Sequence, residues 1–350
     1  MERKNNDSLS SQMKRRVSNK DREEEQYDGN FEDVVTTGST LLDLAISGRR
    51  VRGGGLPSGI VVEAFGPSQS GKTVLLSQIA GEIQRRGGDL QFHDPEARLD
   101  QEFSSLFGMH IPKDKYFVPD TITEVFKEVR TWKPNPGKAS AVNGIFADSL
   151  AALSTNMEME EEEGDKMGMR RAKEFSEQLR KNCRIIRKNN YLMVCSNQVR
   201  VNPEAQKYQQ KFTAPGGKAF EFYSTVRLRF GSPEKIYQSI KIHGKEVKKV
   251  IGITVEIEVI KTADVPYRKA ELSIIYGYGI DDIRANLQYI KDFTKNTVYS
   301  VGDIELSNSL ETAIKKVEDQ GLEKELREQV IDLWEEIDSK FKTERKPRMR

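Results

Sequence analysis

The octapeptide GPSQSGKT, Gly66–Thr73, is the strongest chemical signal in this sequence. It fits the pattern G-x-x-x-x-G-K-[ST], in which backbone N–H groups surround phosphate oxygens, the lysine neutralises the β- and γ-phosphates and the hydroxyl ligates Mg²⁺. An apolar run over 60–65 precedes it and an amphipathic stretch over 74–86 follows, so the loop joins a strand to a helix N-terminus. We expect Lys72 at the solvent edge of this loop. The residues expected to hold ATP here are Gly66, Pro67, Ser68, Gln69, Ser70, Gly71, Lys72 and Thr73.

The chain up to residue 230 alternates short apolar runs with amphipathic stretches. This alternation is typical of an α/β fold with a mostly parallel central sheet flanked by helices on both faces. The predicted strands cover 60–65, 90–94, 145–148, 191–197 and 226–230, and the predicted helices cover 74–86 and 172–188. Beyond residue 230 a period of two predicts strands over 254–259 and 271–276, which make the sheet mixed. From residue 281 onward helical stripes dominate, the last running from Leu322 to Phe341.

Carboxylates at the ends of two further predicted strands complete a site for nucleotide hydrolysis. Asp148 follows the apolar run 145–147 and would orient a water bound to Mg²⁺, which makes Thr73 and Asp148 the expected metal ligands. Glu96, just beyond the strand 90–94, is our candidate base for the attacking water. Structural roles remain alternatives for both residues. Asp148 could simply end a strand at a turn, and Glu96 could cap the N-terminus of a helix. His93 is expected to be a packed strand residue rather than a ligand.

The composition of the chain disfavours several classes of protein, among them disulfide-rich, zinc-stabilised and membrane-spanning proteins. The chain has 350 residues, 56 Lys plus Arg against 54 Asp plus Glu and a formal net charge of +2, so a nucleic-acid surface has to be local. Cys183 and Cys195 lack metal-ligand spacing, which disfavours disulfides and structural zinc. Apolar runs fall far short of the roughly 18 residues that span a bilayer. The N-terminus has no apolar secretory segment, so we expect a cytoplasmic protein with no membrane partner.

The first 33 residues are charged and read as an N-terminal arm. Leu9, Met13 and Val17 are spaced i, i+4 and i+8, which places them on one stripe of a helix. Such a helix would dock on a neighbouring subunit. A disordered tail with three chance hydrophobic residues explains the spacing equally well.

Six sequence segments, taken together, are more specific than any one of them because of their order and spacing. They are GPSQSGKT (66–73), FHDPEARLD (92–100), FADSLAAL (146–153), CSNQVR (195–200), PGGKAFEFYSTVRLRF (215–230) and IYGYGI (275–280). Together they resemble the RecA family of homologous recombinases over about residues 34–282. The resemblance implies a RecA-type ATPase core with DNA-binding loops over 34–282, preceded by the arm 1–33 for subunit docking. A small helical C-terminal domain with a basic tail would occupy 283–350.

The resemblance also implies roles around the nucleotide. Glu96 matches the glutamate that activates water, and Asp100 and Phe103 match residues that contact adenine. Tyr276 and Gly277 match a second side of the base pocket.

Two more matches concern communication beyond the nucleotide. Gln198 matches a γ-phosphate sensor that leads into a DNA-binding loop, and an amide suits that role because it can bond a γ-oxygen and release it after hydrolysis. Lys261 matches the first of two lysines that reach a neighbouring subunit's γ-phosphate. Ala263 stands where the second lysine is usual, so one cation across the interface is missing. Lys218 and Glu221 depart from the family pattern as well, and these departures favour a divergent, phage-encoded member acting in a bacterial or phage-infected cell.

Two loops are expected to contact DNA. The loop after Gln198 combines cations with aromatic rings and chain-breaking Gly and Pro, a composition typical of single-strand binding without base specificity, with a bland surface loop as the alternative. The segment 156–168 is so acidic that a solvated face is an equal alternative, and residues at and beyond its end are the expected DNA neighbours. The predicted DNA contacts are Met167, Met169, Arg170, Arg171, Arg200, Lys207, Tyr208, Lys211, Phe212, Gly216 and Gly217.

The function that this resemblance implies is a DNA-dependent ATPase that uses ATP and Mg²⁺, forms a helical homo-oligomeric filament on single-stranded DNA and promotes strand exchange with homologous double-stranded DNA. Single-strand-binding or mediator proteins would be further partners. The alternative is a ring-forming or regulatory ATPase on the same core without strand exchange. A DNA-binding mediator with a degenerate nucleotide site is opposed by the joint presence of Lys72, Thr73, Glu96 and Asp148.

Overall fold

The computed structural model describes residues 33–160, 167–198, 200–201, 212–213, 218–294, 296–342 and 345. The docking helix predicted around Leu9, Met13 and Val17 therefore lies outside the described residues. In the described ranges, no helix combines the length and the apolar composition that crossing a membrane requires.

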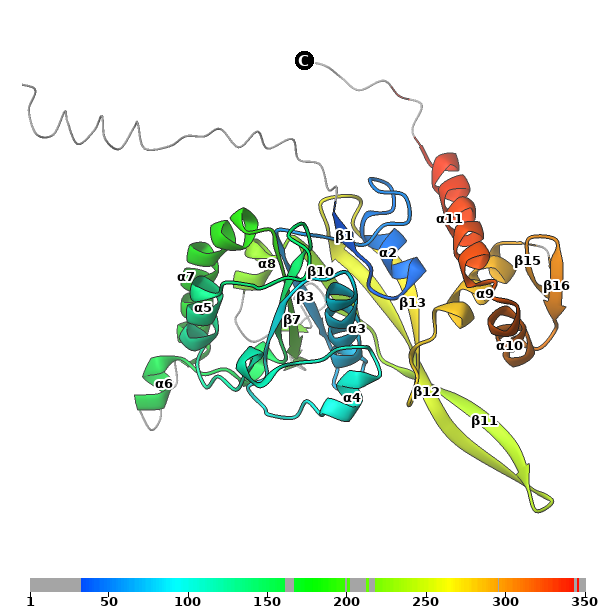
Figure 1. Ribbon diagram of the computed structural model, residues 1–350, viewed down its shortest axis with the longest axis horizontal. Coiled ribbons are helices and arrows are strands. Elements are labelled where there is room, and N and C mark those ends of the chain that lie inside the picture. The colour runs from blue at the N-terminus through cyan, green and yellow to red at the C-terminus, as the bar shows by residue number, and fades with distance from the viewer. Residues whose placement is uncertain are drawn as a thin grey trace, which may run out of the picture. The chain divides into compact units, whose positions relative to one another are not determined.

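A central mixed sheet organises the chain, with strands in the order β14-β13-β12-β10-β3-β7-β6-β4-β5 (Figure 1). Neighbouring strands from β10 to β5 run parallel, whereas β12, β13 and β14 extend the sheet in antiparallel pairs. The strands of this sheet are β3 (Ile60–Gly66), β4 (Leu90–His93), β5 (Tyr116–Phe117), β6 (Asn143–Ala147), β7 (Tyr191–Gln198), β10 (Val226–Phe230), β11 (Glu234–Ile242), β12 (Lys245–Lys261), β13 (Arg268–Ile275) and β14 (Gly279–Ile280). The predicted α/β class with a mostly parallel, mixed sheet is confirmed.

Helices cover both faces of the sheet because its central strands are apolar on both sides. Leu75 and Ile79 of α3 belong to the cluster on one face, with side chains of α2 and α9. Phe175 and Leu179 of α7 belong to the cluster on the other face, with side chains of α5 and α8. The helices are α2 (Thr40–Ser47), α3 (Lys72–Arg85), α4 (Gln101–Ser105), α5 (Ile122–Thr131), α6 (Asn156–Glu160), α7 (Met167–Lys188), α8 (Ala219–Tyr223), α9 (Asp282–Phe293), α10 (Leu310–Gln320) and α11 (Glu323–Lys340), with short 3₁₀ turns at Lys113–Lys115 and Leu150–Ala152.

The C-terminal helices pack onto the core. Asp282, the first residue of α9, accepts hydrogen bonds from the backbone N–H of Thr40 at 2.7 Å and from its hydroxyl at 2.7 Å. Leu326 and Val330 of α11 are fully buried within the same cluster as α2 and α3. The residues from Asp33 onward form one compact unit, and the domain boundary at residue 283 stays a prediction.

The helical prediction for the C-terminal region is wrong in two details. A small hairpin of β15 (Tyr299–Val301) and β16 (Ile304–Ser307) separates α9 from α10. Phe341, predicted to end the last apolar stripe, lies beyond α11 and is 85% exposed.

Three strand pairs complete the described structure. Two short ones stand apart from the central sheet, namely β1 (Val34–Val35) with β2 (Leu56–Pro57) and β8 (Arg200–Val201) with β9 (Phe212–Thr213). The third is a long hairpin, in which β11 pairs only with the first part of β12 and extends past the sheet (Figure 1). The sequence reasoning did not anticipate this hairpin.

Candidate functional site

The phosphate loop connects the end of β3 at Gly66 to the start of α3 at Lys72. Gly71 has φ +90°, a region that side chains other than glycine rarely occupy. A Cβ on Gly66 would lie 2.7 Å from the carbonyl oxygen of Phe230 on the neighbouring strand β10. Both glycines are thus required for the loop to curl tightly against the sheet, as the motif predicts.

Lys72 is 8% exposed, so the expectation that it lies at the solvent edge is wrong. Its Nζ donates to the carbonyl oxygens of Pro67 at 2.5 Å and Gly66 at 3.2 Å, and to Ser70 Oγ at 3.4 Å. The side chain folds back over its own loop because these acceptors replace the water that burial removes. Burial lowers the pKa of Lys72, and the carboxylate of Asp148 opposes this shift.

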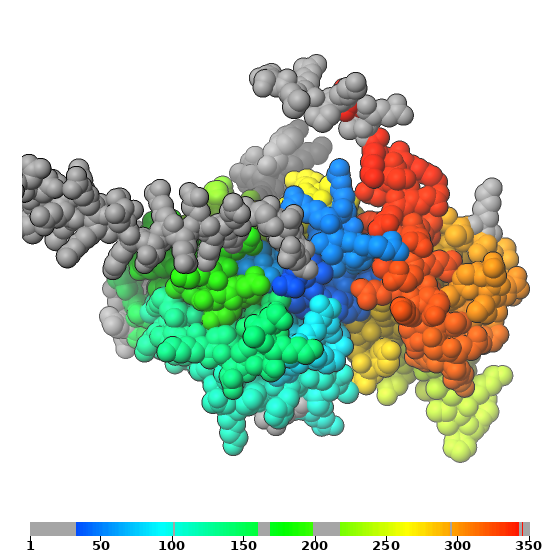
Figure 2. All heavy atoms as spheres, turned by 45° about the horizontal axis from the view of Figure 1, so that its top comes forward, coloured from blue at the N-terminus to red at the C-terminus, as the bar shows by residue number. Residues whose placement is uncertain are grey.

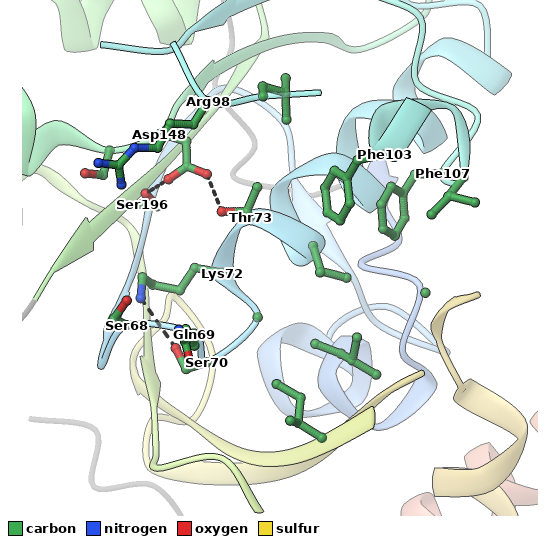
Figure 3. A pocket seen from close by; sticks show the side chains of 18 of the residues that line it. Ser68, Gln69, Ser70, Lys72, Thr73, Arg98, Phe103, Phe107, Asp148 and Ser196 are labelled. Atoms are coloured by element: carbon green, nitrogen blue, oxygen red, sulfur yellow. Dashed lines mark hydrogen bonds between the residues drawn. The ribbon is translucent and has the colours of Figure 1, made fainter. Parts of the chain in front are cut away.

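Thr73 and Asp148 come together at the carboxyl edge of the sheet (Figure 3). The Thr73 hydroxyl donates to Asp148 Oδ2 at 2.6 Å, and the Ser196 hydroxyl donates to the other carboxylate oxygen. A hydroxyl and a carboxylate are hard oxygen donors, and Mg²⁺ is usually held by one or two such groups together with waters and phosphates. The donor set therefore suits Mg²⁺ bound jointly with a nucleotide.

Glu96 lies in the same cavity wall, on the loop after β4, with its side chain 21% exposed. Its Oε1 accepts from the Ser149 hydroxyl at 3.3 Å, and its Oε2 lies 2.5 Å from Arg98 Nη1. Ser149 follows Asp148, one of the two predicted metal ligands, so Glu96 lies beside that predicted pair without a hydrogen bond to it. This is the placement that a base for an attacking water needs.

Asp94, by contrast, organises the loop. Its carboxylate accepts from the backbone N–H groups of Glu96, Arg98 and Leu99 and from the Tyr116 hydroxyl at distances of 2.7–3.2 Å. These bonds fix the chain that presents Glu96.

His93 is fully buried at the end of β4 and stacks on Phe117, with ring centroids 5.1 Å apart. Neither ring nitrogen has a hydrogen-bond partner among the described residues. Burial lowers the pKa of His93 to about 3, so the ring is neutral at physiological pH. The arrangement agrees with the packed strand residue that we expected.

The cavity next to the loop has a volume of about 620 Å³, which is within the range of small-molecule sites. Phe103, Tyr276 and Gly277 line it, as expected for a base pocket. Phe103 packs edge-on against Phe107, whose ring also faces the cavity (Figure 3). Asp100 is not among the described lining residues, and it caps α4 by accepting from the backbone N–H of Glu102 at 3.1 Å. Its expected contact with adenine stays a prediction.

Gln198, the last residue of β7, is exposed and lines the cavity. The end of β7 that carries Gln198 is held to β3, because Asn197 Nδ2 donates to Glu63 Oε1 at 3.0 Å. Glu63 is buried in β3 and also accepts from Arg227 Nε at 2.7 Å. Directly after Gln198, β8 pairs with β9, so the two ends of the predicted DNA loop are held together.

Lys261, at the end of β12, does not line the cavity of its own chain, a statement that covers the described lining residues. Its Nζ donates to the carbonyl oxygens of Glu221 at 2.6 Å and Phe222 at 3.1 Å. Burial lowers its pKa, and Arg227 acts in the same direction, whereas Glu221 and Glu63 oppose the shift. Its expected role toward a neighbouring subunit stays a prediction.

The predicted DNA contacts fall into two groups. Met169, near the start of α7, is 76% exposed, whereas Arg171 Nε is bound to both oxygens of Glu158 at 3.1 and 2.9 Å. Arg170 lies beside them in α7, and the backbones of Met167, Arg200 and Phe212 are placed in α7, β8 and β9. The remaining predicted contacts, Lys207, Tyr208, Lys211, Gly216 and Gly217, lie outside the described residues.

Sequence reasoning did not single out Ser149, Ser196, Arg98 and Glu63. Ser149 directly follows Asp148 in the segment FADSLAAL, and Ser196 stands two positions before Gln198 in CSNQVR, so proximity to these two predicted site residues was the available signal. Glu63 is a charged residue inside the apolar strand IVVEAF, and a buried charge in a central strand calls for a partner.

Similar sequences are found in one protein family and in several bacterial proteins. The RecA N-terminal domain family matches residues 22–281. The protein RecA of Thermus thermophilus is 32% identical over 311 residues, which are 87% of this chain and 86% of that protein. The protein RecA of Thermus aquaticus is 36% identical over 252 residues, 72% of this chain and 69% of that protein. The protein RecA of Delftia acidovorans is 34% identical over 248 residues, 71% of this chain and 63% of that protein.

Proposed function

This chain belongs to the RecA family, and we propose that it hydrolyses ATP while bound to single-stranded DNA, forms a filament of its own copies on that strand and exchanges the strand with a homologous duplex. The observation that carries this proposal is the position of Gln198. It lines the nucleotide cavity and is followed at once by the paired strands β8 and β9, which close the base of the predicted DNA loop. Loss of the γ-phosphate would therefore move Gln198, and through it the base of the predicted DNA loop.

The phosphate loop would hold the triphosphate. Its backbone N–H groups and the start of α3 favour an anion, and Lys72 is already inside the loop. We expect the Lys72 ammonium to exchange its carbonyl partners, Gly66 and Pro67, for phosphate oxygens when ATP binds. Thr73 and Asp148 would hold Mg²⁺, which supplies charge neutralisation at the phosphates.

Hydrolysis would use Glu96 as the base. Its carboxylate would accept a proton from the attacking water, with Ser149 orienting one oxygen. Arg98 holds the other oxygen, but its side chain is 78% exposed, so this ion pair costs little to break. The base is therefore available when substrate is present.

Lys261 would link hydrolysis to assembly. It lies outside its own nucleotide cavity, so a contribution to hydrolysis requires a neighbouring subunit. Because Ala263 cannot act as a second cation, we expect Lys261 to carry the whole positive charge that this strand presents across the interface. This makes turnover dependent on filament formation.

The proposal is tested by measuring ATP turnover with and without single-stranded DNA, and strand exchange between a circular single strand and a homologous linear duplex. We expect DNA to stimulate turnover and exchange to require both ATP and homology. The Lys72→Ala variant serves as the negative control in both assays. Turnover that ignores DNA, together with closed rings in the electron microscope, would instead identify a motor or regulatory ATPase on the same core.

A further inference from the structure

The projecting end of the β11–β12 hairpin, residues 234–250, contributes no side chain to the described lining of the nucleotide cavity. Strand β11 spans nine residues, about 30 Å at about 3.4 Å per residue. It pairs only with β12, and the part of β12 that pairs with residues 237–242 has no second neighbouring strand in the described structure. The hairpin stands clear of the body in yellow-green at the lower right of Figure 2. A two-stranded ribbon without a third strand is only marginally stable in water, so its retention calls for a function.

The hairpin is strongly basic. Residues 234–250 hold five lysines and two glutamates, a net charge of +3, although the whole chain carries only +2. All five lysines are exposed, and none forms an ion pair with a described residue. They are Lys235, Lys241, Lys245, Lys248 and Lys249. A surface of this charge attracts a polyanion.

The shape of the hairpin favours duplex over single-stranded nucleic acid. His243 and Gly244 form its two-residue turn with φ of +48° and +78°, and the ladder is paired up to Ile242 and Lys245, so the ribbon is preformed. A two-stranded ribbon fits the major groove of a duplex. Single-strand platforms instead stack bases on open aromatic rings, and Tyr237 has Lys248 Nζ only 4.4 Å from its ring centroid.

The two faces of the ribbon suit a groove as well. Cross-strand pairing places Lys241 and Lys248 on one face and Lys245 and Lys249 on the other, so both walls of a groove meet cations. Ile240, Ile242 and Val247 lie between the lysines of the second face and are 45–53% exposed. Three such side chains are too few for the core of a stable protein interface, but they can contact thymine methyl groups or sugars.

We propose that the β11–β12 hairpin is a duplex-DNA-binding arm, which inserts its lysine-flanked ribbon into a groove of the double strand. This inference rests on the proposed function, in which a filament on single-stranded DNA has to capture a duplex. It assigns that capture to a segment separate from the loop after Gln198. The contact is to the backbone phosphates and is therefore largely independent of sequence.

The test uses the full-length protein with Lys241, Lys245, Lys248 and Lys249 all changed to Gln. The control changes four exposed lysines elsewhere, Lys113, Lys127, Lys133 and Lys138, to Gln. Filaments are assembled on single-stranded DNA with a non-hydrolysable ATP analogue, and capture of a labelled 30-base-pair duplex of unrelated sequence is followed by fluorescence anisotropy over a series of salt concentrations. The same duplex is titrated with nucleotide-free protein.

We expect the hairpin variant to bind duplex about tenfold or more weakly than the wild type and the control, with a salt slope smaller by about 0.9 for each phosphate that the variant no longer binds. Its affinity for single-stranded DNA and its ATP turnover should stay within about twofold of the wild type. A photoreactive phenylalanine analogue in place of Ser239 should crosslink to the duplex, which gives a second readout that does not depend on removing charge.

Three results would overturn the proposal: unchanged duplex binding, an equal reduction of single-strand binding, or an effect confined to self-association without DNA. A different result would show that the proposed recombinase function, rather than the hairpin site, is wrong. Wild-type protein that shows no DNA-stimulated turnover but still binds duplex through the hairpin would refute the recombinase assignment and keep the hairpin site.

Discussion

Removing the charge of Glu63 tests how Gln198, the predicted γ-phosphate sensor, is held. Glu63 lies in β3 with a side chain that is 1% exposed, and it accepts from Arg227 at 2.7 Å and from Asn197 at 3.0 Å. Glu63→Gln keeps the volume but removes the charge and leaves one acceptor oxygen for two donors, so Arg227 and Asn197 can no longer both donate to this side chain. Arg227 is itself only 13% exposed and stacks 4.7 Å from the Phe65 ring centroid, so it cannot recover full hydration without moving.

The expected loss of stability follows from this burial. Breaking a buried ion pair by removing one partner costs about 3–5 kcal/mol, whereas an exposed pair is worth about 0–1 kcal/mol. The residual exposure of Arg227 places Glu63→Gln near the lower end of the buried range, at about 3 kcal/mol. Because Glu63 also anchors Asn197, the neighbour of Gln198, stimulation of turnover by DNA should fall more than basal turnover does.

Urea denaturation of the nucleotide-free protein, followed by tryptophan fluorescence, measures the change. The matched variant Arg227→Met and the double variant complete a cycle, and we expect the double variant to be more stable than the sum of the single losses by about 2 kcal/mol. A loss of stability below about 1 kcal/mol for Glu63→Gln, or strictly additive losses, would refute the reasoning.

Four other substitutions have outcomes that the structure determines, three at the nucleotide site and its interface and one at a buried carboxyl in α2. Lys72→Ala should abolish turnover and weaken ATP binding with retained fold, as circular dichroism and nucleotide titration would show. Glu96→Gln should slow turnover by about 100-fold or more at nearly unchanged ATP affinity, and normal turnover would remove Glu96 as the base. Lys261→Ala should lower turnover only under conditions that allow assembly, and a loss of ATP affinity in the isolated subunit would contradict its role at the interface. Burial raises the pKa of Asp43 to about 6 from 3.8, so its contribution to stability is complete below about pH 4 and is lost as the pH rises through about 6, by up to about 3 kcal/mol. Asp43→Asn should remove that part of the pH dependence from urea denaturation curves, whereas an unchanged dependence would exclude Asp43 as its source.

The phosphate loop and the strand ends could be predicted because each depends on local sequence. Gly66 and Gly71 are fixed by backbone geometry, and Asp148 follows an apolar run that forms the central strand β6, as the pairing with the phosphate loop predicted. The parallel edge of the sheet then brings Asp148 beside Thr73 at 2.6 Å without further information.

Other features depend on contacts that the linear sequence does not display. Glu63 and Arg227 are separated by 164 positions and meet only because β10 lies beside β3. Lys72 is buried because the carbonyl oxygens of its loop point inward and accept from its ammonium group. The direction of these carbonyl groups cannot be predicted from the residue types in the loop.

The β11–β12 hairpin escaped prediction for a different reason. Both of its faces are exposed, and the face that carries Ile240, Ile242 and Val247 is interrupted by Gln238, Lys245 and Lys249, so the period of two is too short to stand out. The His243–Gly244 pair was the available turn signal, since Gly favours the positive φ that a two-residue hairpin turn requires.

We propose that ATP and single-stranded DNA together convert this protein into a recombination filament. Negative-stain electron microscopy with a non-hydrolysable ATP analogue, with and without single-stranded DNA, tests it most directly. We predict helical filaments whose length follows the length of the DNA strand, and no such filaments from Lys72→Ala. Closed rings of fixed size, or assemblies that form identically without nucleotide, would contradict the claim.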